Sequence, residues 1–348
     1  MNSNSKIPVG VLGATGSVGQ KFIELLSNHP WFEVGEIAAS EKSAGQLYGQ
    51  RVNWFSSFPL PEKIARLEIK ECIPNLDCRV VFSGLDSSVA GEIEQDFARN
   101  GYIVVSNSKN HRMDKDVPLI VPEINADHLK LIKSQKNGGG CIVTNPNCST
   151  IGLVLALKPL LDNFGLESVN VVTLQALSGA GHPGVPSLDI MDNSIPFISG
   201  EENKVETEPL KIFGKFQSDE IKNLELKIGA QCNRVAVVDG HLECVQVNLK
   251  NKASLQDIKE AWINFSAEPQ KLKLPLAPTK PIYYFEEDRY PQPKLHRNLD
   301  KGMAVSIGRL RKDPLFDYKF VLLSHNTVRG AAGGAILVAE LMKAKSYL

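Results

Sequence analysis

The chain has 348 residues, 43% of them hydrophobic and 22% charged, which is typical of a protein with two globular domains and substantial cores. Lys plus Arg and Asp plus Glu both number 39, so the zero formal net charge offers no electrostatic attraction for nucleic acid or an anionic membrane. No run approaches the ~18 apolar residues that a membrane span needs, and the polar start MNSNSKIPVG does not resemble a signal peptide. The six cysteines include no CxxC pair and there is no HExxH motif, so we expect free thiols, a cytoplasmic location and no metal site.

The first segment has the pattern of a nucleotide-binding unit. A short apolar strand from Pro8 to Leu12 runs into a G-x-x-G-x-x-G motif (Gly13 to Gly19) and then a helix from Gln20 to Asn28. Glycines in this context allow a tight turn and the close approach of a pyrophosphate to a helix N-terminus. We therefore expect this unit to bind a dinucleotide. A glycine-rich turn that serves only packing is the alternative.

The end of the next strand bears on the choice of cofactor. The strand Val34 to Ala39 is followed by Ser40-Glu41-Lys42-Ser43. NAD sites usually place a carboxylate at this point to bind the ribose 2′-hydroxyl. Two serines and a lysine suit a 2′-phosphate better, so the turn favours NADP. Glu41 leaves NAD open, and an ordinary solvated turn is the other reading.

Strands and helices then alternate as far as residue 147. The expected elements are strands at Arg79–Ser83, Tyr102–Ser106 and Cys141–Thr144, with a helix at Val89–Asn100. Alternation of this kind predicts a parallel, doubly wound sheet, hence an α/β fold with an N-terminal Rossmann-like dinucleotide-binding domain.

Cys148 lies at the start of an apolar helical run, in the stretch TNPNCSTIGLVLALKPLL. Pro146 disfavours helix before it, and Asn147 is a suitable N-cap, which places Cys148 in the first turn. Unpaired N–H groups and the helix dipole stabilise an anion there, so a Cys148 thiolate would be nucleophilic. A half-buried structural cysteine is the alternative.

Beyond Cys148 the pattern changes to strands with long polar connections. These strands are expected at Ser168–Leu174, Asn233–Val238, His241–Leu249, Met303–Leu310 and Lys319–Leu323. We expect a second α+β domain with a mostly antiparallel sheet. The helix-like run Asn326 to Lys345 should pack back onto the first domain. The predicted domains are therefore 1–147 with 326–348, which binds NADP, and 148–325, for catalysis and dimerisation.

A catalytic cysteine needs a base, and His241 is the best placed of the seven histidines. It follows a strand and tight turn, Arg234 to Gly240. If that turn closes a hairpin, Arg234 and His241 project into one site. We also expect His241 to be protonated and to favour the Cys148 thiolate. A histidine that only completes a hairpin is the alternative.

Several motifs together resemble the aspartate-β-semialdehyde dehydrogenase family, in its archaeal and fungal branch. They are GATGSVG, NPNCST, QALSGAG, RVAVVDGH and NTVRGAAG, and they extend over essentially the whole chain. The resemblance implies NADPH-dependent reduction of L-aspartyl-4-phosphate to the semialdehyde through a cysteine thioester, and the reverse oxidation with inorganic phosphate. It also implies a homodimer or homotetramer in amino-acid biosynthesis.

The resemblance also implies roles for individual residues. Cys148 would be the nucleophile, His241 the acid/base, and Gln175 would position the acyl group. Arg234 would bind the substrate α-carboxylate and Glu208 its amino group, with the phosphate held by Asn107, Arg112 and Lys211. The cofactor-binding residues would be Gly13, Thr15, Gly16, Ser17, Val18, Ser40, Lys42, Ser43, Ser83, Gly179 and Asn326.

Other families match less well. A malonyl-CoA reductase would need no amino-group site, which Glu208 argues against. The cysteine contexts of N-acetyl-glutamyl-phosphate reductases and glyceraldehyde-3-phosphate dehydrogenases differ from NCSTI. Tyr290 and Lys294 have the spacing of a short-chain dehydrogenase, but the prolines between them forbid the helix. A protein of another class, a non-catalytic NADP sensor, would not need a reactive Cys148.

Overall fold

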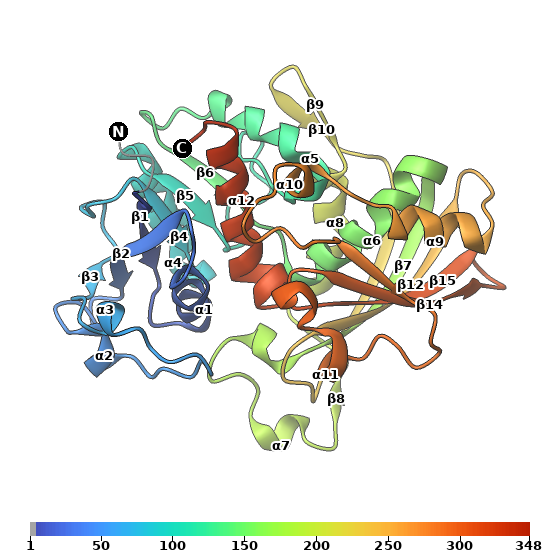
Figure 1. Ribbon diagram of the computed structural model, residues 1–348, viewed down its shortest axis with the longest axis horizontal. Helices are drawn as coiled ribbons and strands as arrows, with labels where there is room; N and C mark the ends of the chain where they lie inside the picture. Colours follow the sequence, from blue (N-terminus) through green and yellow to red (C-terminus); the bar gives the residue numbers. More distant parts are fainter. Residues whose placement is uncertain (1–4) are drawn as a thin grey trace.

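The computed structural model describes residues 5–348 and contains two regions, each built around its own sheet (Figure 1). Residues 1–4, the beginning of the expected first domain, lie outside the described residues. In the described part of the chain, no helix is long and apolar enough to cross a membrane.

The first sheet has six strands, all parallel. In sheet order they are β3 (Lys70–Glu71), β2 (Phe32–Ala39), β1 (Ile7–Leu12), β4 (Val80–Ser83), β5 (Ile103–Ser106) and β6 (Cys141–Thr144). The connections contain α1 (Ser17–Leu26), α2 (Tyr48–Arg51), α3 (Glu62–Ala65), α4 (Ser87–Arg99), α5 (Pro122–Asn125) and a 3-10 segment (Ala126–Ser134). This strand order is that of dinucleotide-binding folds, so the predicted doubly wound sheet is confirmed.

The C-terminal helix α12 (Gly333–Ala344) completes the core of the first sheet. Its apolar side chains, Ile336 and Leu337 among them, are fully buried with residues of β1, β2 and β5. In Figure 1 it is the red helix between the two regions. The chain therefore returns to the first sheet, as the sequence predicted, but the run begins with a π-helical turn (Val328–Ala332).

The second sheet has seven strands, and four of its six pairings are antiparallel. In sheet order they are β13 (Ile282–Phe285), β14 (Val305–Lys312), β15 (Tyr318–Ser324), β12 (His241–Leu249), β7 (Leu166–Gln175), β11 (Lys227–Val235) and β8 (Ser194–Ile195). The expected mostly antiparallel sheet is thus present. The strands β9 (Lys215–Gln217) and β10 (Glu220–Lys222) form a separate small hairpin that the sequence did not predict.

Helices cover one face of this second sheet. The central one is α6 (Cys148–Phe164), flanked by α8 (Glu201–Ile212) and α9 (Leu255–Ile263). Of the shorter helices, α10 (Glu268–Lys271) contacts α5, and α11 (Pro293–His296) packs its His296 ring on Phe285 of β13. Eleven of the 17 residues of α6 are buried, because the helix packs against the sheet on one side and against α5 on the other. This packing brings the N-terminus of α6 to the boundary between the two regions.

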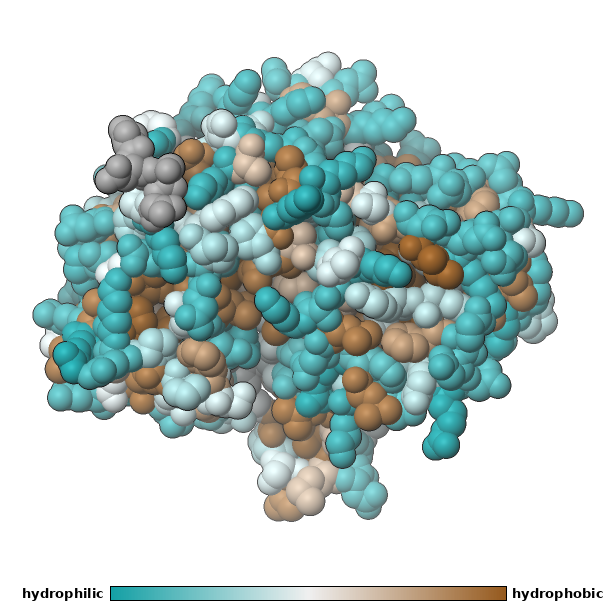
Figure 2. Space-filling view, viewed as in Figure 1, coloured by the Kyte–Doolittle hydropathy of each residue, from teal (hydrophilic) through white to brown (hydrophobic). Residues whose placement is uncertain are grey.

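An arm of residues 182–200, with α7 (Ser187–Ile190) and β8, projects from the second region (Figure 1). It carries three exposed apolar side chains: Leu188 at 89%, Met191 at 65% and Phe197 at 64% exposure. Figure 2 shows this projection at the bottom of the view, with hydrophobic surface on it. Apolar side chains gathered in this way mark a contact surface.

Candidate active site

Cys148 is the first residue of α6, as the sequence predicted. The Asn147 side chain caps the helix, because its Oδ1 accepts hydrogen bonds from the backbone N–H groups of Ser149 (3.0 Å) and Thr150 (3.2 Å). The Cys148 sulfur therefore lies at the positive end of a 17-residue helix. This position stabilises negative charge that forms on or beside the sulfur.

His241 lies next to this sulfur. Its Nε2 is 3.2 Å from Cys148 Sγ, and its Nδ1 accepts the backbone N–H of Ala176 at 3.0 Å. A neutral imidazole carries its single proton on one nitrogen. Because Nδ1 accepts a hydrogen bond, that proton is on Nε2, where it is donated toward the sulfur.

The expected protonated His241 is corrected by the structure. Burial, with the nearby Arg234 charge, lowers the pKa of the His241 imidazole to about 3. Burial, with the nearby Glu201 carboxylate, raises the pKa of the Cys148 thiol to about 12. A second proton on the imidazole would lie on Nδ1 and would point at the Ala176 N–H, which donates to that nitrogen. The pair is therefore a thiol beside a neutral imidazole at neutral pH, not a thiolate–imidazolium pair.

We predict the pH dependence of Cys148 alkylation from this state. The rate should rise steadily between about pH 6 and pH 10, because the thiol loses its proton at high pH and His241 does not titrate in this range. Iodoacetamide labelling followed by peptide mapping measures the rate. A rate that is constant across this range would indicate a preformed thiolate–imidazolium pair and contradict the assignment.

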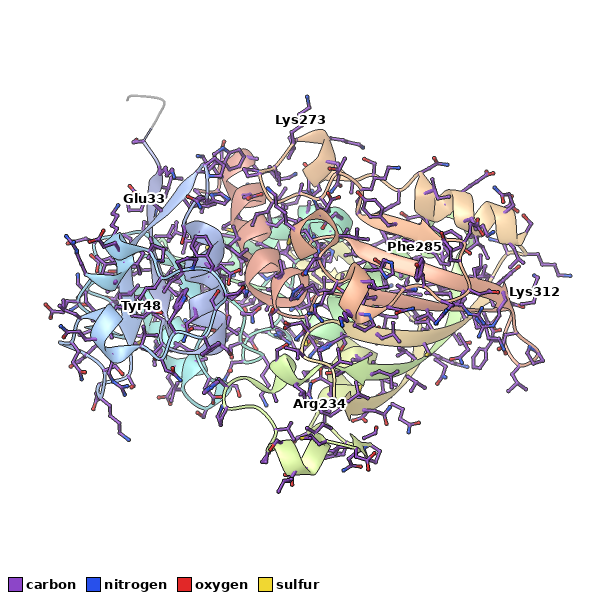
Figure 3. All side chains as sticks on the ribbon, turned by 60° about the horizontal axis from the view of Figure 1, so that its bottom comes forward. Glu33, Tyr48, Arg234, Lys273, Phe285 and Lys312 are labelled. Atoms are coloured by element: carbon purple, nitrogen blue, oxygen red, sulfur yellow. The ribbon has the colours of Figure 1, made fainter. Side chains whose placement is uncertain are left out.

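Arg234 and Gln175 lie in the same row of the sheet as His241. Arg234 on β11 pairs with Gln175 on β7, and the neighbouring strand β12 begins at His241. The hairpin expected between Arg234 and His241 is absent, because β7 lies between β11 and β12. Both side chains nevertheless meet at one residue: Ala176, whose carbonyl accepts Nη1 of Arg234 at 2.5 Å. Figure 3 shows Arg234 in the second region.

Gly179 packs against the side chains of Arg234 and His241. A Cβ at Gly179 would lie 3.0 Å from Nη1 of Arg234 and 3.2 Å from Cε1 of His241, so a larger residue would displace both. Asn326 holds the neighbouring loops together, since it donates to Ser178 Oγ and accepts from the Gly240 backbone, both at 2.8 Å. The loops after β7 and β11 thus converge on Cys148.

A cleft of about 500 Å³ opens above Cys148 between the two regions. On the nucleotide side it is lined by Gly16, Ser17, Val18, Gly179 and Asn326. On the other side it is lined by Asn107, Arg112, Cys148 and Lys204. The first set comes from the predicted cofactor residues, and the second includes two cations that suit an anionic ligand.

Other predicted residues lie away from this cleft. Gln175 is buried, and its amide donates to Thr173 Oγ1 at 3.2 Å. Ser83 is buried at the end of β4. The turn Ser40 to Ser43 lies beyond β2 and does not line this cleft, nor do Gly13 and Thr15.

Glu208 and Lys211 are not free to bind substrate. Glu208 accepts Nη1 of Arg112 at 2.9 Å and the backbone N–H of Asn147 at 2.7 Å. The Lys211 ammonium is buried and donates to the carbonyls of Arg112, Asp114 and Val117 at 2.7–2.8 Å. Both residues hold the walls of the cleft in place, which corrects the roles expected from the sequence.

Glu201 and Lys204 lie at the site, about two helical turns before Glu208 and Lys211 on α8. The sequence did not predict a role for either residue. They form an ion pair with each other, and Glu201 also accepts Asn147 Nδ2 at 2.8 Å. Lys204 lines the cleft. Their E-x-x-K spacing was visible in the sequence, but it is repeated by Glu208 and Lys211.

Comparison with known proteins finds one enzyme family along most of the chain. Residues 8–132 match the family model "semialdehyde dehydrogenase, NAD binding domain", and residues 157–329 match "semialdehyde dehydrogenase, dimerisation domain". The aspartate-semialdehyde dehydrogenase of Archaeoglobus fulgidus is 51% identical over 338 residues, covering 96% of this chain and 97% of that protein. The Schizosaccharomyces pombe enzyme is 49% identical, covering 98% and 99%.

The chain belongs to the aspartate-semialdehyde dehydrogenase family. The relatives come from an archaeon and a fungus, which confirms the predicted resemblance. A crystal structure of the family member from Candida albicans with NADP has a TM-score of 0.92 and 45% identity, and it covers 98% of this chain and 100% of that one. The fold and the enzyme class, an oxidoreductase, are thereby established.

Proposed function

We propose that the protein interconverts L-aspartyl-4-phosphate and L-aspartate-4-semialdehyde, using NADPH or NADP and a thioester on Cys148, in amino-acid biosynthesis. The observation that supports this most strongly is the position of Cys148: at a helix N-terminus, 3.2 Å from His241 Nε2, on a cleft lined by the cations Lys109, Arg112 and Lys204. The nucleophile, its hydrogen-bond donor and an anion site thus occur together.

We assign the substrate groups by charge. Arg112 and Lys204, with Asn107, line the cleft and would bind the phosphate. Arg234 would bind the α-carboxylate with the part of its guanidinium that Ala176 does not hold. Glu201 would receive the amino group in place of Glu208 by exchanging its ion pair with the partly exposed Lys204 for the substrate ammonium, since its carboxylate is near both Cys148 and His241. Gln175 is buried next to Arg234 and would help to position the acyl group from there.

The chemistry follows from the Cys148–His241 pair. Attack by the sulfur on the acyl carbon forms the C–S bond and releases phosphate, while backbone N–H groups at the start of α6 stabilise the oxyanion. When the C–S bond breaks at the end, the electron pair returns to the sulfur, which accepts the hydrogen bond from His241 Nε2. The leaving phosphate takes the Cys148 proton, and the thiolate that remains when the C–S bond breaks takes up one proton from water to restore the thiol.

The first region fits a dinucleotide. A Cβ at Gly13 would lie 2.8 Å from the Gly84 carbonyl, and one at Gly19 would lie 2.2 Å from the Gly13 carbonyl, so only glycine allows this compact loop. Helix α1 begins without a side-chain cap among the described residues, which leaves its first N–H groups available for a pyrophosphate. Tyr48, which is labelled in Figure 3, supports the loop through a 2.7 Å hydrogen bond to the Ala14 carbonyl. The bound nicotinamide would accept or supply the hydride beside Asn326 and Gly179.

We predict a preference for NADP over NAD. The Ser40 and Ser43 hydroxyls and the exposed Lys42 would bind a 2′-phosphate, for which the turn offers two hydroxyls and a cation. Comparison of kcat/KM for the two cofactors tests this, and Ser40→Asp should shift the ratio toward NAD by repelling the phosphate. Equal or better use of NAD by the unmodified protein would refute the assignment.

We propose that the enzyme works in the cytoplasm as a homodimer or homotetramer. The dimerisation family model covers the projecting arm and its exposed Leu188, Met191 and Phe197. The six cysteines are free thiols in the structure. Sedimentation of the purified protein tests the oligomeric state, and a monomer at micromolar concentration would refute it.

Two assays run side by side separate the proposed reaction from its alternatives. We expect phosphate-dependent reduction of NADP with aspartate semialdehyde, and no oxidation of NADPH with malonyl-CoA. The reverse result would identify a malonyl-CoA reductase on the same scaffold. Binding of NADP without turnover in either assay would indicate a non-catalytic sensor.

A further inference from the structure

A buried ion pair lies behind the active site, and the proposed mechanism does not use it. Arg329 donates from Nη1 to Glu123 Oε1 at 2.8 Å and from Nη2 to Oε2 at 2.5 Å. The two side chains are 1% and 0% exposed. A two-pronged contact of this kind fixes orientation as well as distance.

Arg329 belongs to the π-helical turn that packs on Cys148. The turn closes with hydrogen bonds five residues back, from Gly330 to His325 and from Ala332 to Thr327. A Cβ at Gly330 would lie 2.8 Å from Cys148 Cβ and 3.0 Å from its Cα. The backbone of the turn is therefore in direct contact with the reactive residue, and π turns are frequent at functional sites.

Glu123 lies on a segment that is tied to the end of β6, the strand just before Cys148. It lies on α5, which Asn125 secures through hydrogen bonds to the Val121 N–H and the Leu119 carbonyl, at 2.9 and 2.8 Å. Leu119 bridges to Thr144 at the end of β6, four residues before Cys148. The ion pair thus joins the turn above Cys148 to the strand that leads into it.

We propose that the Arg329–Glu123 pair positions Cys148 by holding the π turn against it. Neither charge reaches the cleft, so both are positioning residues and not catalytic ones. The same turn follows Asn326 and Thr327, which line the cleft, so its position also sets the nucleotide side of the site. This inference rests on the proposed function, because it takes Cys148 as the nucleophile.

The alternative is that the pair only stabilises the fold. Replacement of a buried ion pair by apolar residues often leaves stability unchanged, whereas removal of one partner leaves an unpaired buried charge. A double variant, Glu123→Leu with Arg329→Met, therefore separates the two roles. Arg329→Lys is the milder change, because it keeps the charge and loses the two-pronged geometry.

The test measures the Cys148 alkylation rate, kcat, KM and the melting temperature of both variants. We expect alkylation and kcat to fall about 10- to 100-fold in each, with little change in KM, since small displacements of a reacting group have effects of this size. The double variant should keep its melting temperature. Alkylation needs no substrate, so it reports on Cys148 even if the proposed substrate is wrong, and wild-type turnover decides that question separately.

Glu340→Gln is the matched control. Glu340 is equally buried in the same region and pairs with His29 at 2.7 Å, but neither residue packs on Cys148. We expect it to lower the melting temperature and to leave alkylation and kcat unchanged. Normal alkylation and kcat in both Arg329 variants, an equal loss in the control, or failure of both variants to fold would each overturn the proposal.

Discussion

Cys148→Ser is expected to fold normally, to bind NADP and to lose turnover by at least about 10⁴-fold in kcat, since loss of a covalent nucleophile leaves only binding and oxyanion stabilisation. A serine hydroxyl at the start of α6 has a far higher pKa than a thiol, and neutral His241 is not placed to remove its proton. Steady-state kinetics with aspartate semialdehyde, NADP and phosphate measure the loss, and NADP binding confirms that the cofactor site is intact.

Cys72→Ser is the control for this experiment. Cys72 is a half-buried free thiol next to the edge strand β3, where it packs against apolar side chains and its sulfur donates to the Ala39 carbonyl at 3.5 Å. It should keep full activity. In the wild type, iodoacetamide should label Cys148 first, because it is the only one of the six cysteines that lines the cleft. Substantial activity in Cys148→Ser would exclude a sulfur nucleophile.

Arg234→Lys is expected to lower kcat/KM for the semialdehyde by roughly 10- to 100-fold, equivalent to about 1.5–3 kcal/mol for a charge-assisted hydrogen bond. Nη1 of Arg234 is bound to the Ala176 carbonyl, and the rest of the guanidinium fork would bind the carboxylate. A lysine ammonium keeps the charge but cannot hold both partners in the same plane. NADP affinity should be unchanged.

Arg311→Lys provides the matched control for Arg234. Arg311 also donates to a backbone carbonyl, that of Arg309, but it lies exposed on β14. It should have no effect on kcat/KM. Normal kinetics in Arg234→Lys would mean that Arg234 only holds the loop after β7, and the carboxylate site would have to be sought elsewhere in the cleft.

The first sheet and the helix start at Cys148 were predictable because their signals are local. The glycine spacing, the apolar strand before it and the Asn147 cap each involve residues close in sequence, and β6 has the predicted bounds Cys141–Thr144. The strand β12, His241–Leu249, also has the predicted bounds. Local physics is sufficient for such elements.

The pairing of strands was not predictable in the same way. The turn between Arg234 and His241 has the pattern of a hairpin, yet β7 lies between the two strands. Insertion of a third strand depends on contacts with residues some 60 positions earlier, and nothing in the turn itself encodes them. Arg234 and His241 still meet, because both bind Ala176 at the end of that inserted strand.

The substrate residues on α8 show a second limit. Glu201 and Lys204 have the same spacing as Glu208 and Lys211, and the two pairs are seven residues apart. Seven residues are close to two helical turns, so both pairs lie on one face of the helix. Only the surroundings of each side chain in the structure distinguish them: Lys204 lines the cleft, whereas Lys211 is enclosed by backbone carbonyls.

Burial likewise sets the protonation of the Cys148–His241 pair. The sequence indicated a thiolate from the helix start, but it contains no measure of how deeply the imidazole would be enclosed. Complete burial and the Ala176 N–H keep His241 neutral. A helix N-terminus and a neutral donor can then stabilise the sulfur anion as it forms, without a permanent ion pair.

The most direct test of this account is to trap the acyl-enzyme. Wild-type protein would be incubated with aspartate semialdehyde and NADP in phosphate-free buffer, quenched in acid and mapped by peptide mass spectrometry. We predict an aspartyl group on the Cys148 peptide, which disappears when phosphate is added before the quench. An acyl group on any other residue, or none on Cys148 while the enzyme turns over with phosphate, would contradict a Cys148 thioester.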